Sequence, residues 1–132
     1  MIDKKEQLIF EGSHSFIFLT EIQDYPKPVI VKVLKKDQPT LQEIVQFNNE
    51  FEFTVNTNIS GVRKAYQKTY FKHQSALVLE YIEGQTLRQR LQSQTFSVAD
   101  ILSIAIQLCQ TLGEIHQLGI IHKDLNPSNL LI

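Results

Sequence analysis

Three polar residues occur at fixed spacing in the closing stretch IIHKDLNPSNLLI, residues 120–132. Pro127 disfavours a continuous helix, so His122, Asp124 and Asn129 are expected on a loop between two apolar runs. A carboxylate can accept a hydrogen bond from an attacking hydroxyl, and an amide oxygen suits magnesium, which prefers hard oxygen ligands. Polar groups of these types, held on one loop, are expected to face a cleft. The alternative is a helix end, an Asx-type turn and a strand that carry no chemistry.

The first half of the chain is predicted to form strands interrupted by one helix. Residues 8–20 and 29–34 are rich in Ile, Val and Phe, and the polar segment between them favours a hairpin. Thr40 and Glu43 have the spacing of a capping box, and apolar residues then recur at helical spacing over residues 41–57. Two further strands are predicted in VRKAYQKTYF and SALVLEYI, and Gly84 ends the second region.

The second half is predicted to be helical before the polar loop. Thr86 is suited to cap a short helix in LRQRLQ, and Ser97 with Asp100 has the pattern of another capping box. A wide apolar stripe with a period of 3.6 residues then predicts a long helix over residues 98–117. Cys109 lies within this stripe, so we expect a small buried side chain rather than a reactive thiol.

Composition sets broad limits on the class of protein. The chain has 132 residues, of which 42% are apolar and 20% charged, so one globular unit is expected. A formal net charge of −1 gives no reason to expect nucleic acid or an anionic membrane as a partner. The single cysteine excludes an internal disulfide, and the chain shows no signal core and no uncharged stretch of spanning length. We therefore expect a cytoplasmic setting.

Several segments in order resemble the N-terminal half of a eukaryotic-type protein kinase domain, of the serine/threonine kind found in bacteria. The closing loop matches H-x-D-x-x-x-x-N, and V-I-V-K matches the strand motif V-A-I-K. Between these lie a hinge-like LVLEYIEG and, ahead of the lysine, LIFEGSHSFIFLT in the place of a glycine-rich loop. Only Gly12 remains of the loop's glycines, and an ordinary hairpin turn explains that segment equally well. The resemblance covers essentially the whole chain.

This resemblance implies an α+β, protein-kinase-like fold. An antiparallel N-lobe sheet with one main helix, and the hinge, would occupy residues 1–82. The first helices of an incomplete helical C-lobe would occupy residues 83–132. The whole of 1–132 would then be a partial kinase domain, ending after the catalytic loop.

The resemblance also implies roles for single residues, with ATP and Mg²⁺ as cofactors. Lys32 would contact nucleotide phosphates and pair with Glu50 on the following helix. Glu52 points to a different helix face, because residues two apart do not neighbour one another. A solvated charge is the alternative for Glu50. Gly12 would lie in the loop that covers the phosphates, and the backbone of Glu80 and Ile82, after the gatekeeper Leu79, would bind adenine. Asp124 would orient the acceptor hydroxyl, and Asn129 would bind magnesium.

The sequence departs from the family pattern inside the catalytic loop. Lys123 replaces the arginine of H-R-D, and its ammonium lacks the planar fork that binds a phosphorylated activation loop. Asn126 stands where serine/threonine kinases usually have a lysine near the transferred phosphate. We expect this lost charge to lower the rate or to alter the acceptor preference. His122 is expected to hold the loop by hydrogen bonds rather than to act as a base.

The larger departure is that no D-F-G segment follows the catalytic loop. Its aspartate is a principal magnesium ligand, so this chain alone is expected to be inactive or nearly so. The apolar stripe over 98–117 and the final LLI are expected to lack packing partners, which favours association and poor solubility. We interpret the chain as a truncated product or as part of a larger multidomain signalling protein.

Three functions remain open on the sequence alone. The first is a serine/threonine protein kinase that transfers the ATP γ-phosphate to a hydroxyl of an unknown protein substrate. The second is a small-molecule phosphotransferase of the aminoglycoside or choline kind, which shares H-x-D-x-x-x-x-N. The third is a pseudokinase-like module that binds nucleotide or docks with another chain without catalysis. LVLEYIEG followed by TLRQRL favours the first over the second.

Overall fold

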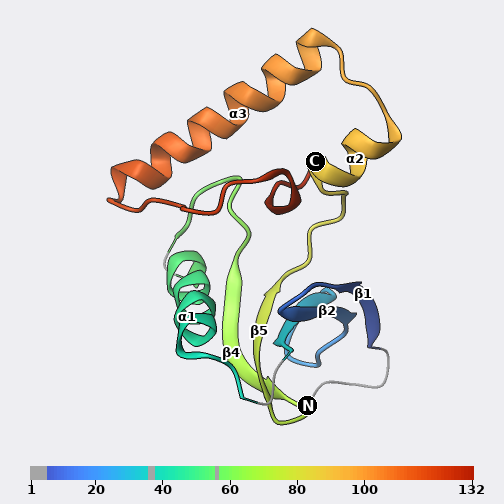
Figure 1. Ribbon diagram of the computed structural model, residues 1–132, viewed down its shortest axis with the longest axis vertical. Coiled ribbons are helices and arrows are strands. Elements are labelled where there is room, and N and C mark those ends of the chain that lie inside the picture. Colours follow the sequence, from blue (N-terminus) through green and yellow to red (C-terminus); the bar gives the residue numbers. More distant parts are fainter. Residues whose placement is uncertain (1–5, 36–37, 56) are drawn as a thin grey trace. The chain divides into compact units, whose positions relative to one another are not determined.

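The computed structural model describes residues 6–35, 38–55 and 57–132. The chain forms two compact units, which we describe separately. The first unit combines residues 1–58 with 63–81, and the second combines residues 59–62 with 82–132. Figure 1 shows the ribbon coloured along the sequence, with most of the helices and strands labelled.

The first unit is built on a five-stranded antiparallel sheet with the strand order β1-β2-β3-β5-β4. The region predicted as one strand over 8–20 is two strands, because Gly12 and Ser15 close a turn between them. The Gly12 N–H donates to the Ser15 carbonyl over 2.9 Å. The strands are β1 Gln7–Glu11, β2 Ser15–Thr20, β3 Val29–Leu34, β4 Ala65–Phe71 and β5 Gln74–Glu80.

A single helix, α1 Leu41–Val55, covers one face of this sheet. It begins at the predicted capping box, in which Glu43 accepts from the Thr40 N–H over 2.8 Å and Thr40 accepts from the Glu43 N–H over 3.2 Å. It ends two residues before the predicted boundary. Phe47 and Phe51 pack on the sheet, where α1 runs alongside β4 (Figure 1).

The central strands β3 and β5 are buried on both faces of the sheet. Their side chains alternate between two apolar clusters, as the period of two along a strand requires. One cluster lies under α1 and contains Ile30, Leu34, Phe47, Ala65, Leu77 and Leu79. The other lies on the opposite face and contains Ile22, Val29, Val31, Val33, Phe71, Ala76 and Val78.

The second unit contains α2 Leu87–Ser93, α3 Val98–Gln117 and the short 3₁₀ helix η1 Pro127–Asn129. Thr86 with Gln89 caps α2, and Ser97 with Asp100 caps α3, so both predicted caps are present. The bounds of α3 agree with the sequence prediction, since a capping box fixes one end and the chain turns at Gly119 after the other.

The final apolar run is not left without backbone partners, contrary to the sequence expectation. Ile132 exchanges hydrogen bonds with Gln85, at 2.9 and 3.3 Å, and the Leu87 N–H donates to the Leu130 carbonyl over 2.8 Å. Gly84 permits this pairing because its φ is +154° and a Cβ would lie 3.0 Å from the Ile132 carbonyl oxygen. The segment before α2 therefore anchors the end of the chain.

Helix α3 exposes most of its apolar stripe. Ile115 is buried, whereas Leu102 and Ile106 are each 56% exposed. Cys109 is also exposed, so the expectation of a buried cysteine is wrong: it shares a side of α3 with Leu102 and Ile106, which no described segment covers. By length and composition α3 could cross a membrane, but core helices of soluble proteins meet the same criterion.

The cap of α3 should depend on acid. Hydrogen bonds from the Ser97 hydroxyl and N–H, at 2.6 and 3.0 Å, hold the pKa of Asp100 below its usual value of 3.8. A lowered folded-state pKa contributes stability above the usual value, and that stability is lost as pH falls through the folded pKa. Asp100→Asn should therefore reduce helicity at pH 7, and the difference from the unaltered chain should close as pH falls through the lowered folded-state pKa of Asp100. Circular dichroism at 222 nm from pH 7 into this acid range measures the difference, and a difference that stays constant would contradict the prediction.

Candidate active site

Lys32 of β3 and Glu50 of α1 form an ion pair in the first unit. Strand alternation places Lys32 on the same face of β3 as Ile30 and Leu34, which is the face that α1 covers. Its Nζ donates to Glu50 Oε2 over 2.6 Å. The two side chains are 26% and 37% exposed, so the pair is partly shielded from water and is held more firmly than a fully solvated one.

The structure separates the two glutamates that the sequence offered as partners for Lys32. Glu52 lies on another side of α1 and pairs with Lys68 of β4, with Nζ and Oε1 3.8 Å apart. Lys68 also lies over the ring of Phe51, 4.9 Å from its centroid. Helix α1 is thus held by one ion pair to β3 and by a second, looser one to β4.

Arg63, which was not among the residues predicted for the site, adds a second cation near Glu50. Burial lowers the pKa of Arg63, and the carboxylates of Glu50 and Glu80 act in the opposite direction. Its Nε is buried and has no hydrogen-bond partner among the described residues. A basic residue in a short loop before a strand gives no sequence signal that would distinguish it from a solvated charge.

The residues named for adenine binding lie where β5 ends. Leu79 is buried on the face that α1 covers. The Glu80 N–H donates to the Lys64 carbonyl over 2.9 Å, so an adenine contact at Glu80 would use its carbonyl oxygen. The Glu80 side chain accepts from the Lys64 N–H over 3.1 Å, which fixes the strand end. Ile82 follows outside any strand, is exposed and begins the longer segment of the second unit.

Gly12 lies in the tight β1–β2 turn, in the place predicted for the phosphate-covering loop. A Cβ at this position would lie 3.0 Å from a ring carbon of Phe10 and 3.5 Å from the Ser15 carbonyl oxygen. The absence of a side chain therefore allows the backbone to turn closely beside Phe10. The turn is that of a hairpin, and the backbone amides of Ser13 and His14 lie at its tip.

Asp124 and Asn129 are brought together in the catalytic-type loop of the second unit. The Asn129 Nδ2 donates to Asp124 Oδ2 over 3.0 Å and to the Asp124 carbonyl over 2.8 Å. Asn126 makes two similar hydrogen bonds: its Nδ2 donates to Asp124 Oδ1 over 3.1 Å and to the Asp124 carbonyl over 3.2 Å. Two amides thus fix the orientation of one carboxylate.

Further contacts hold the backbone of this loop. The Asp124 N–H donates to His122 Nδ1 over 3.2 Å, in keeping with the structural role expected for His122. Asn126 Oδ1 accepts from the Ser128 N–H over 2.9 Å and so caps η1. Lys123 has a φ of 65°, a left-handed conformation that is strained for a residue with a side chain.

The loop has the groups that hydroxyl activation and magnesium binding require. Each Asp124 carboxylate oxygen accepts one amide hydrogen and keeps a second lone-pair site for a substrate hydroxyl. Because the Asn129 amide nitrogen points to Asp124, its carbonyl oxygen is free of those two bonds and is a hard ligand of the kind magnesium prefers. Within the described ranges, no group of three or more His, Cys, Asp or Glu forms a ready-made metal site.

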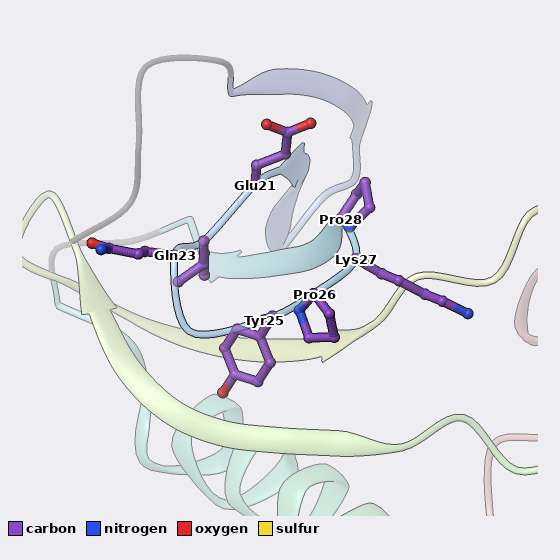
Figure 2. A pocket seen from close by; sticks show the side chains of 7 residues that line it. Glu21, Gln23, Tyr25, Pro26, Lys27 and Pro28 are labelled. Carbon is purple, nitrogen blue, oxygen red and sulfur yellow. The ribbon is translucent and has the colours of Figure 1, made fainter.

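A separate hollow of about 410 Å³ lies in the β2–β3 connection of the first unit, and none of the predicted site residues lines it. Its polar side chains Glu21, Gln23 and Lys27 point in different directions and do not converge (Figure 2). Ligand sites bring a few polar groups to a common point, so this hollow lacks the arrangement of a nucleotide site.

The chain belongs to the protein kinase domain family, whose model matches residues 4–132. It is 30% identical over 130 residues to "Probable serine/threonine-protein kinase CPE1738" of Clostridium perfringens, covering 96% of this chain and 19% of the relative. It is 28% identical over 136 residues to the KEOPS complex subunit Bud32 of Pyrococcus abyssi, covering 96% of this chain and 61% of that protein.

Solved structures show the same fold. The PknI kinase domain of Mycobacterium tuberculosis superposes with a TM-score of 0.79 at 19% identity, over 95% of this chain and 52% of that chain. The five-stranded sheet with α1 corresponds to the expected N-lobe, and the following helices correspond to the start of the C-lobe. The predicted α+β, protein-kinase-like fold is therefore confirmed. The present chain spans about half of that domain and about a fifth of the Clostridium kinase.

Proposed function

We propose that this chain supplies the nucleotide-binding part and the catalytic loop of a serine/threonine protein kinase domain. Residues 1–82 act as the N-lobe and hinge, and residues 83–132 as the start of the C-lobe. The observation that carries the proposal is the 2.6 Å ion pair between Lys32 and Glu50 within a kinase fold. The substrates are ATP and a protein hydroxyl, and the setting is the cytoplasm.

Each residue has a defined task in this proposal. Lys32, held by Glu50, contacts the nucleotide phosphates beneath the Gly12 turn, and the backbone of Glu80 and Ile82 contacts adenine. Asp124 accepts the hydrogen bond of the acceptor hydroxyl and orients its oxygen toward the γ-phosphate. Asn129 offers its amide oxygen to magnesium, which when bound offsets the charge of the phosphate oxygens.

The two amides on Asp124 support this division of tasks. A carboxylate fixed by Asn126 and Asn129 needs no reorganisation when the hydroxyl arrives, which is the basis of catalytic preorganisation. Without the D-F-G aspartate, phosphoryl transfer by these 132 residues alone should be very slow, and nucleotide binding is the activity to measure. A non-catalytic nucleotide-binding module is therefore the second candidate, and a small-molecule phosphotransferase is the third.

The test is ATP binding by calorimetry, with magnesium and with a chelator in its place. The unaltered chain should bind ATP more tightly with magnesium, and Lys32→Ala should weaken that binding about tenfold, because a charge-assisted contact to phosphate is lost. Lys68→Ala is the matched control, since it removes the other lysine paired with α1, at 3.8 Å from Glu52. Its affinity should stay within about twofold of the unaltered chain.

The possible results separate the alternatives. Equal losses in the two lysine variants would mean that Lys32 acts only through fold stability, and the proposed phosphate contact would be wrong. No binding by the unaltered chain would overturn the nucleotide site as a whole. Binding that does not depend on magnesium would favour the non-catalytic module.

A further inference from the structure

His14, at the tip of the β1–β2 turn, contacts the first turn of α1. Its Nδ1 lies 3.1 Å from Glu43 Oε1. Because a carboxylate only accepts hydrogen bonds, Nδ1 must be the donor. The Glu43 side chain is 12% exposed although that of His14 is 67% exposed, so the acceptor is fixed in place while the donor reaches it from the surface.

Glu43 joins this contact to the start of the helix. Its second oxygen, Oε2, accepts from the Thr40 N–H over 2.8 Å and from the Thr40 hydroxyl over 3.1 Å. One carboxylate therefore caps α1 with one oxygen and holds the turn with the other. Glu50, which pairs with Lys32, lies two turns further along the same helix.

Lys35, just after β3, holds the same turn from a second side. Its backbone N–H donates to the His14 carbonyl over 2.9 Å. Its ammonium donates to the Gly12 carbonyl over 3.2 Å and to Glu11 Oε1 over 2.5 Å. The turn is thus tied both to the strand that carries Lys32 and to the helix that carries Glu50.

From these contacts we propose that His14 is a positioning residue for the nucleotide site. Through Glu43, it fixes the Gly12–Ser15 turn against α1, so that the turn and the Lys32–Glu50 pair are set together before nucleotide arrives. This role for His14 deepens the proposed function, and it rests on that function for the identity of the ligand as a nucleotide. A turn held in advance costs less to order on binding, so the contact raises nucleotide affinity.

The contact is tested first without nucleotide, by amide hydrogen exchange of Gly12 and Lys35. Both amides are bonded within the turn, to the Ser15 and His14 carbonyls. His14→Ala should speed their exchange about threefold, the scale of an exposed ion pair. In a Glu43→Ala background the same change should have no further effect. Thr40→Ala is the control, because it weakens the cap of α1 and leaves Glu43 able to reach His14.

Unchanged exchange in His14→Ala, or an equal effect with and without Glu43, would overturn the proposal. The second measurement is the affinity for magnesium–ATP, which His14→Ala should lower about threefold, again only when Glu43 is present. Faster exchange with unaltered affinity would overturn the link to nucleotide. Failure of the unaltered chain to bind ATP would overturn the proposed function. The hydrogen-exchange result would then still decide whether the His14–Glu43 contact holds the turn.

Discussion

Replacing Leu77 by alanine is expected to lower the free energy of unfolding of the first unit by about 2–5 kcal/mol. Leu77 is fully buried in the centre of β5, on the face covered by α1. Removing three carbon atoms there leaves a cavity that neighbours on both sides of the strand cannot fill without moving. Leu77 also lies opposite Lys32 in the β3–β5 register, so the cavity forms beside the ion pair. Chemical denaturation followed by circular dichroism measures the change.

The matched control is Leu41→Ala, the same substitution at the exposed start of α1. Leu41 is 78% exposed, so the change should stay within about 0.5 kcal/mol. Equal losses at the two positions would contradict the burial pattern described for the first unit. A loss at Leu77 with no change in m-value would show that the substitution lowers stability without changing the surface exposed on unfolding.

The helices were the part of the fold that local chemistry determined. A capping box fixes the start of α3 at Ser97, and an apolar period of 3.6 carries the helix to Gln117. The order of the strands is a different matter, since β5 lies between β3 and β4 although it follows both in the chain. No spacing within the sequence encodes that insertion, and the family resemblance implied an antiparallel sheet without specifying the strand order.

The candidate site was predictable where residue type and family pattern agree. Lys32 and Glu50 were named together because the family pattern pairs a strand lysine with a glutamate on the following helix. Glu50 was preferred to Glu52 because the two lie on different faces of the helix. The contact between His14 and Glu43 was missed, since the residues are far apart in the chain and each is ordinary at a surface. Asn126 was read only as a lost positive charge, whereas its amide also fixes Asp124. Side-chain orientation of this kind does not follow from composition or period.

The exposed apolar side of α3 is expected to have a large effect on the association state of the chain. Leu102 and Ile106 lie one turn apart, each is more than half exposed, and Val98 and Ile101 extend the same apolar surface. Exposed surfaces of this kind favour association, so the unaltered chain should elute from size exclusion mainly as oligomers or aggregates. Leu102→Glu combined with Ile106→Glu should shift most of the protein to a monomer, because charge on the exposed side opposes association without disturbing a packed core.

Glutamate on the other side of the same helix should do the opposite. Ile115 is 3% exposed, so Ile115→Glu buries a carboxylate with no partner. This substitution should unfold the second unit rather than make the protein more soluble. Light scattering and circular dichroism of the two variants separate solubility from folding. An unaltered chain that is already a monodisperse, cooperatively unfolding monomer would show that this surface does not drive association. If it is oligomeric, the double variant alone decides whether α3 is the contact, because it changes the exposed side and leaves Ile115 in place.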